Sequence, residues 1–133
     1  MNDAVMTYSQ AATLQRIARD MGLQLDELLH PYREVKMIGE DGEQCWRIVD
    51  FDPYTDPADA FRVQVHFNLS LESDRDSFIV READGPLLAI HFIEEKTIEG
   101  RVRAACMAIC EGAARWLTNN DKRAAANSQR DLD

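Results

Sequence analysis

Features that define several large classes of proteins are missing from this sequence. No stretch approaches the ~20 consecutive apolar residues of a transmembrane helix. The N-terminal residues 1–4 lack the basic start and apolar run of a signal peptide. The three cysteines are an odd number in a chain without an export signal, which is typical of reduced thiols in a cytosol. We therefore expect a cytoplasmic protein.

Positive charge is also scarce. Fifteen Lys and Arg residues stand against 24 Asp and Glu residues, and the formal net charge is −9. This balance argues against nucleic acid and against an anionic membrane surface as partners. Residues 17–29 resemble the closing helices of repressor-type helix-turn-helix domains, but the upstream helix pair is missing, so we interpret them as packing helices.

Seven acidic residues and a single basic residue, Arg47, lie between positions 40 and 59: Glu40, Asp41, Glu43, Asp50, Asp52, Asp56 and Asp59.

The remaining 45% apolar content is typical of a globular domain. Apolar spacing and capping residues predict a helix that starts after Ser9 and stops at Gly22, and a helix over 98–118 that is capped by Thr97 and ended by Asn119 and Asn120. Residues 121–133 are predicted to be a flexible, polar tail. Between the helices the sequence predicts a helical turn at 24–29, strands at 32–38 and 45–51 around a turn at 39–42, and a hairpin of strands at 78–82 and 87–93.

The segment from Asp56 to Leu71 allows two structures. Asp56 can cap a helix whose first position is Pro57, with Phe61, Val65 and Leu69 on one face. From Phe61 onward, however, apolar and polar residues alternate strictly, which favours a half-buried strand.

Two short motifs point to a family. Over about residues 10–118, the chain resembles the phage and prophage ABA-sandwich proteins. The resemblance is carried by the turn Pro53-Tyr54-Thr55-Asp56-Pro57-Ala58-Asp59-Ala60-Phe61 and by the helix Ala108-Ile109-Cys110-Glu111-Gly112-Ala113-Ala114-Arg115-Trp116-Leu117. Glu111-Gly112 departs from the basic-alanine pair usual in that family. The resemblance implies a helix after Asp56, a host bacterial cytoplasm and no established activity.

We therefore expect an α+β fold with one domain over 1–120. It would be a three-layer α/β/α sandwich with a small, mostly antiparallel sheet of three to four strands, of which the apolar strand 87–93 is central.

The acidic region is the candidate functional surface. Aromatic side chains among carboxylates can anchor a protein partner and attract a basic one. The residues that we expect to bind a partner are Asp41, Glu43, Trp46, Asp50, Asp52, Tyr54, Asp56 and Asp59. The function expected is that of a small phage or prophage accessory protein, without enzymatic activity or cofactor, that binds a host or phage protein with a basic surface. One form of this hypothesis is an inhibitor of a host nucleic-acid-binding or defence protein. In the other interpretation the acidic residues only keep the protein soluble.

Other chemistries are weaker alternatives. Asp50 and Asp52 at the end of a strand resemble the nucleophile motif of haloacid-dehalogenase-type phosphatases, which would make the protein a metal-assisted hydrolase. A calcium site at Asp50, Asp52 and Asp56 lacks the central glycine and the bidentate glutamate that calcium loops use. Cys106 and Cys110 have the i, i+4 spacing of zinc ligands, but core packing is the preferred interpretation. His91 is expected to be a hydrogen-bonded core histidine.

A homodimer is also expected. Met107, Trp116 and Leu117 extend the apolar surface of the last helix beyond one narrow stripe, and a twofold contact would bury both copies of that surface.

Overall fold

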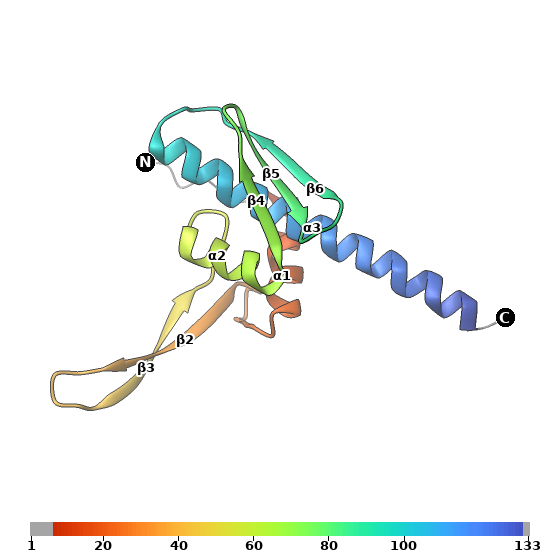
Figure 1. Ribbon diagram of the computed structural model, residues 1–133. Helices are drawn as coiled ribbons and strands as arrows, with labels where there is room; N and C mark the ends of the chain where they lie inside the picture. The colour runs from red at the N-terminus through yellow and green to blue at the C-terminus, as the bar shows by residue number, and fades with distance from the viewer. Residues whose placement is uncertain (1–6, 132–133) are drawn as a thin grey trace. The chain divides into compact units, whose positions relative to one another are not determined.

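The computed structural model describes residues 7–131 and shows an α+β protein with three helices and two antiparallel sheets of three strands each (Figure 1). The chain forms two compact units, of which one ends at Asp52 and the other begins at Pro53. The α+β class and the antiparallel pairing predicted from the sequence are confirmed. The sequence predicted one sheet of three or four strands, whereas the structure divides six strands between two sheets. None of the helices described has the length and apolar character that crossing a bilayer requires.

The first unit consists of one helix and a sheet in the order β1-β2-β3. Its elements are α1 (Tyr8–Asp20), β1 (Gln24–Leu25), β2 (Pro31–Ile38) and β3 (Gln44–Asp50). The N-cap of α1 is Thr7, not Ser9 as predicted, because Thr7 and Gln10 form a capping box in which each side chain bonds the other residue's backbone N–H.

The helical turn predicted at 24–29 is wrong. Residues 24 and 25 form the short edge strand β1, which pairs with β2 in the register Gln24 to Tyr32. The turn that follows is held by the Asp26 carboxylate, which accepts hydrogen bonds from the backbone N–H groups of Leu28 (2.8 Å) and His30 (2.9 Å). A side chain that satisfies the backbone in this way competes with helix formation.

The two long strands of the first unit confirm the predicted hairpin around residues 39–42. The strands β2 and β3 pair antiparallel from Tyr32 with Asp50 to Ile38 with Gln44. The connecting turn places Gly42 at φ +76°, a conformation that glycine adopts without steric cost. Backbone bonds from Gly42 N–H to the Gly39 carbonyl and from Gly39 N–H to the Glu43 carbonyl close the turn.

The second unit consists of two helices and a sheet in the order β4-β5-β6. Its elements are α2 (Pro57–His66), β4 (Leu69–Ser73), β5 (Ser77–Glu82), β6 (Leu87–Phe92) and α3 (Ile98–Asp131). The helix α3 packs on the sheet, and α2 packs against α3 and β4. The Phe67 and Trp116 rings, 5.2 Å apart, join the α2 end of this core to α3.

Residues 57–66 form the helix that the resemblance implied, and the strand begins only at Leu69. Asp56 caps the helix by accepting a bond from Ala58 N–H, and Pro57 fits its first turn. Val63 and Phe67 are buried at helical spacing, whereas Phe61 and Val65 are exposed. The alternating letters were therefore misleading because two of the apolar residues face solvent.

The prediction that strand 87–93 is central is wrong, because β5 is the central strand and β6 is an edge strand. The continuous apolar run in β6 does not reflect two covered faces. Ala89 and His91 lie on the side of α3, whereas Ile90 and Phe92 remain exposed on the opposite face.

The helix α3 starts at the predicted residue, Ile98, but continues to Asp131 and does not end at Asn119 and Asn120. Residues 121–131 of the segment predicted as a polar, flexible tail are thus helical, and their flexibility stays a prediction; residues 132 and 133 lie outside the described part. A Cβ atom at Gly112 would lie 2.4 Å from Val80 Cγ1. Gly112 therefore lets α3 approach β5 closely, which is a physical reason for glycine where the resemblance predicts another residue.

Candidate functional site

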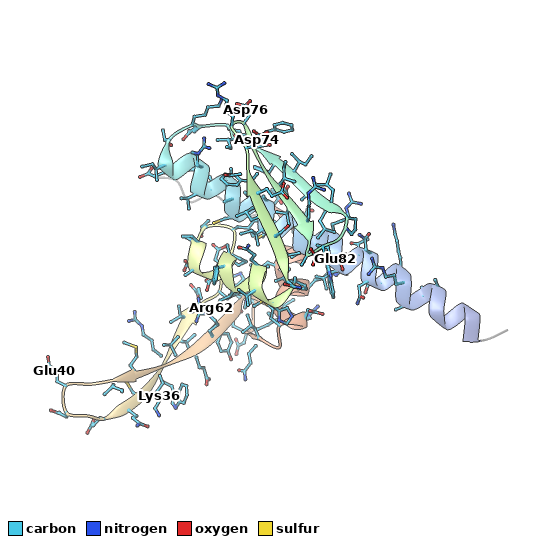
Figure 2. The ribbon with its side chains drawn as sticks, in the orientation of Figure 1. Lys36, Glu40, Arg62, Asp74, Asp76 and Glu82 are labelled. Carbon is cyan, nitrogen blue, oxygen red and sulfur yellow. The ribbon has the colours of Figure 1, made fainter. Side chains whose placement is uncertain are left out.

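The most unusual surface in the described part of the chain is the hairpin of the first unit. We call β2, β3 and the turn between them the hairpin arm, residues 31–50. Nearly all side chains of β3 are exposed, and on β2 burial decreases from Pro31 towards Ile38. Figure 2 shows these side chains standing out from both faces of the arm, with Glu40 at its tip.

One face of the hairpin arm combines three large apolar side chains. Cross-strand partners share a face, and the register pairs Ile38 with Gln44, Lys36 with Trp46 and Glu34 with Ile48. On this face Ile38 is 73% exposed, Trp46 is 66% exposed and Ile48 is 64% exposed. We call these three residues the apolar face of the arm. An exposed cluster of this kind typically marks an interaction site.

The tip of the hairpin arm is acidic. Glu40, Asp41 and Glu43 are all exposed and lie in or directly beside the turn. Lys36, labelled in Figure 2, is the positive charge on β2 that lies nearest to the tip, and it lies on the side of the tip towards the base of the arm. The arm thus presents a negative end next to its apolar face.

The sequence-predicted site residues divide into three environments. Four of them, Asp41, Glu43, Trp46 and Asp50, are exposed on the hairpin arm. Tyr54 and Asp59 are buried, and Asp59 Oδ1 accepts a hydrogen bond from Arg62 Nη1 at 3.2 Å. This burial makes both unsuitable as contact residues.

The other two predicted residues have local surroundings of their own. Asp56 caps α2, and Asp52 is half-buried. The arm belongs to the first unit, whereas residues from Pro53 onward belong to the second. The predicted residues before Asp52 are therefore exposed, and partner binding by all eight residues stays a prediction.

Sequence reasoning missed two members of the apolar face, Ile38 and Ile48. The signal was present, because Trp46 and Ile48 are two positions apart and alternate residues of a strand share a face. What the sequence did not show was that this face would remain exposed in the described part of the chain.

A cavity in the first unit lies at the base of the hairpin arm. Its volume is about 390 Å³, and Asp50 and Asp52 line it together with His30 and with the apolar side chains of α1 and the loop before β2. The two carboxylates of the hydrolase alternative thus share one cavity. Within residues 7–131, however, no group of three His, Cys, Asp or Glu side chains is placed to hold a metal ion.

The cysteines and His91 have neighbours that suit packing. Cys106 and Cys110 are both buried in α3, in the core of the second unit. His91 Nδ1 lies 3.0 Å from Glu111 Oε1, so His91 is hydrogen-bonded as predicted, although it is half-buried and not fully in the core. Core packing by the cysteines remains a prediction.

Comparison of the chain with protein-family models, with curated proteins and with solved structures gave no match. The resemblance to ABA-sandwich phage proteins therefore stays a prediction, and any function has to be argued from the surfaces of the two units.

Proposed function

We propose that this protein acts by binding another protein through the hairpin arm. The observation behind this proposal is the apolar face of the arm, on which Ile38, Trp46 and Ile48 are each more than half exposed. An isolated two-stranded hairpin is marginally stable in water, and additional burial is needed to hold it. A partner that covers the apolar face would supply that burial.

The energies involved are large enough for specific binding. Complete burial of one such side chain is worth about 1.5–3 kcal/mol, and tryptophan is enriched among the residues that dominate binding energy. Ordering of both surfaces reduces the net gain. We expect Trp46 to be the main anchor, with Ile38 and Ile48 beside it.

The chemistry of the partner follows from the charge of the arm. Glu40, Asp41 and Glu43 surround the tip, and the whole chain has a formal charge of −9. A partner with an apolar cleft and a basic rim complements both features, because opposite charge accelerates encounter and the cleft accepts the anchor. We propose that the partner is a host or phage protein, and that a basic nucleic-acid groove is the surface that the acidic tip occupies. The protein would then be a phage or prophage accessory factor.

Site-specific cross-linking in bacterial cells tests this proposal. A photo-reactive amino acid at position 46 should yield a discrete cross-linked protein with a basic surface. The matched control has the same amino acid at Glu72, which is exposed on a strand of the second unit. Equal cross-linking from both positions, or none from position 46, would contradict the proposal.

Tryptophan fluorescence gives an independent measurement with the cross-linked partner. The chain has two tryptophans, and Trp116→Phe leaves Trp46 as the reporter. Because Trp46 is mostly exposed, its emission should shift to shorter wavelength when the partner buries it. An unchanged spectrum at saturation would place the contact elsewhere.

The metal-assisted hydrolase remains the second candidate, since Asp50 and Asp52 line one cavity. Mg²⁺ is often held by one or two carboxylates and completed by substrate phosphates. If this candidate were right, Mg²⁺ or Mn²⁺ should raise the melting temperature, and Asp50→Asn with Asp52→Asn should abolish the rise. We expect no shift with Mg²⁺, Mn²⁺ or Ca²⁺.

A further inference from the structure

The edge strand β6 has backbone groups that no other strand within residues 7–131 pairs. In antiparallel pairing, successive residues point their N–H and C=O groups alternately to the two sides. Ile93 N–H donates to the Asp76 carbonyl, and the β5–β6 register continues this pattern through His91 and Ala89. The backbone groups of Ile90 and Phe92 therefore point away from β5, to the open edge.

This edge has little of the protection that exposed edges usually have. Charged side chains, proline or bulges normally prevent edge-to-edge pairing. The strand β6 contains no Asp, Glu, Lys or Arg, and its irregularity lies towards Leu87, opposite Val80 and Arg81. The stretch from Ala89 to Phe92 is regular, and it exposes 45% of Ile90 and 69% of Phe92 on the face opposite α3.

A groove with charges of both signs runs beside this edge on the α3 side. It has a volume of about 670 Å³ and lies between β6 and the α3 residues Glu111, Arg115 and Asn119. The helix runs antiparallel to β6 along the groove. Glu111 contacts His91, and Arg123, further along α3, lies 3.9 Å from Glu82, beyond the other end of β6.

From these features we infer that a second copy of this chain docks on β6, in an antiparallel twofold contact that joins two three-stranded sheets into one of six strands. The two β6 strands pair with Ile90 opposite Ile90 of the second copy. His91 then lies opposite Ala89 of the other strand. This register uses the outward backbone groups of Ile90 and Phe92 and buries their side chains.

The charges on α3 favour a second copy of this chain as the partner. They also favour one register of the contact between the two β6 strands. A rise of 1.5 Å per helical residue and 3.3 Å per strand residue places the midpoint between Glu111 and Arg115 beside Ile90. A twofold axis at Ile90 therefore brings Glu111 of each copy towards Arg115 of the other. The same two residues, Glu111 and Arg115, thus form both charge contacts across the axis, as an isologous contact requires.

The residues that led the sequence analysis to a dimer are not the ones used here. Trp116 packs against Phe67 and Leu117 is buried, so two of the three residues expected from the sequence at a dimer contact pack inside the second unit, and Met107 is half-buried. The inferred contact is independent of the hairpin arm and does not rest on the proposed function.

Sedimentation velocity on the full chain tests the inference. The chain has a mass of 15.1 kDa, and we expect a species of twice that mass at high micromolar concentration. Ile90→Lys should weaken dimerisation at least tenfold, because it buries a charge at the axis. The matched control, Ile48→Lys on the hairpin arm, should remain dimeric. A monomeric wild-type chain, or a dimeric Ile90→Lys variant, would overturn the inference.

The helical signal in the circular dichroism spectrum and a cooperative melting curve show whether each variant folds. If Ile90→Lys does not fold, Phe92→Lys replaces it, because Phe92 is more exposed and its substitution disturbs the monomer less. A dimeric Phe92→Lys variant would overturn the inference in the same way.

Charge exchange tests the axis itself. Arg115→Glu places two carboxylates opposite each other and should weaken dimerisation at least tenfold. The double variant Glu111→Arg with Arg115→Glu restores opposite charges across the axis, so it should regain most of the wild-type affinity. A double variant as weak as Arg115→Glu alone would overturn the proposed register.

Discussion

The two units place the same kinds of apolar side chain in opposite surroundings. In the second unit, α3 covers one face of the sheet, and Phe78 and Val80 are buried there. In the first unit, the strands β2 and β3 continue well beyond the short strand β1, and the apolar face of the arm remains exposed. Apolar composition alone therefore does not show whether the apolar side chains of a strand are buried. What decides this is whether another element packs on it.

The largest contrast should come from one aromatic residue in each unit. Phe78→Ala in the covered face of the second sheet should lower the free energy of unfolding by about 3–5 kcal/mol, because it leaves a cavity in a packed core. Trp46→Ala on the hairpin arm should change it by about 0.5 kcal/mol or less, since Trp46 is mostly exposed. Urea denaturation of both variants makes the comparison. Equal losses would show that the arm is part of a core.

The next effect concerns the close approach of α3 to the sheet. Gly112→Ala should lower the free energy of unfolding by about 1–3 kcal/mol, because the new methyl group collides with Val80 and overpacks the core. The higher helix propensity of alanine, worth about 1 kcal/mol, opposes this loss. In a double-mutant cycle, Val80→Ala should reduce the cost of Gly112→Ala. A stabilised Gly112→Ala variant would contradict the close packing.

A smaller loss is expected at the buried cysteines. Cys106→Ala and Cys110→Ala should each cost about 1 kcal/mol, because each removes one small buried side chain. Cys110 is as buried as Cys106, so similar costs are expected at the two positions. Cys45→Ser on the arm is the exposed control.

Metal analysis decides between packing and zinc binding at these two positions. With packing, chelators should leave the melting temperature unchanged. About one zinc ion per purified chain, together with severe unfolding in either variant, would contradict packing, since metal binding is then part of the folding free energy.

The helix caps should give effects no larger than those at the cysteines, and of similar size in the two units. Asp56→Ala removes the acceptor for Ala58 N–H at the start of α2 and should cost about 1 kcal/mol. Thr7→Ala removes half of the capping box of α1 and should cost a similar amount. Asp56→Asn is the matched control and should retain most of the stability. Thermal unfolding of the three variants checks this, and a neutral Asp56→Ala would show that the cap is not needed.

Elements with a local signal could be predicted from the sequence. The hairpin of β5 and β6 follows from Asp84-Gly85-Pro86 between two apolar runs, and the start of α3 follows from Thr97, whose hydroxyl accepts from Gly100 N–H. Elements that depend on their surroundings could not. The apolar run of β6 predicts burial on both faces, yet its place at the edge is set by the topology of the sheet.

The candidate site shows the same division. The acidic turn and Trp46 were visible as charge and aromatic content, and the structure places them on one hairpin. Tyr54 and Asp59 belong to the same acidic stretch but are buried. Charge density along the chain does not report burial. Ile38 and Ile48 were missed because their exposure depends on the absence of a covering layer.

The most direct test of the account measures stability and binding on one variant of the hairpin arm. The substitutions Ile38→Ser, Trp46→Ser and Ile48→Ser remove the apolar face and leave the acidic tip unchanged. We expect the melting transition of the second unit to be retained, while affinity for the partner cross-linked from position 46 falls at least tenfold, or ~1.4 kcal/mol. Unchanged affinity in this folded variant would contradict the claim that the arm is the recognition surface.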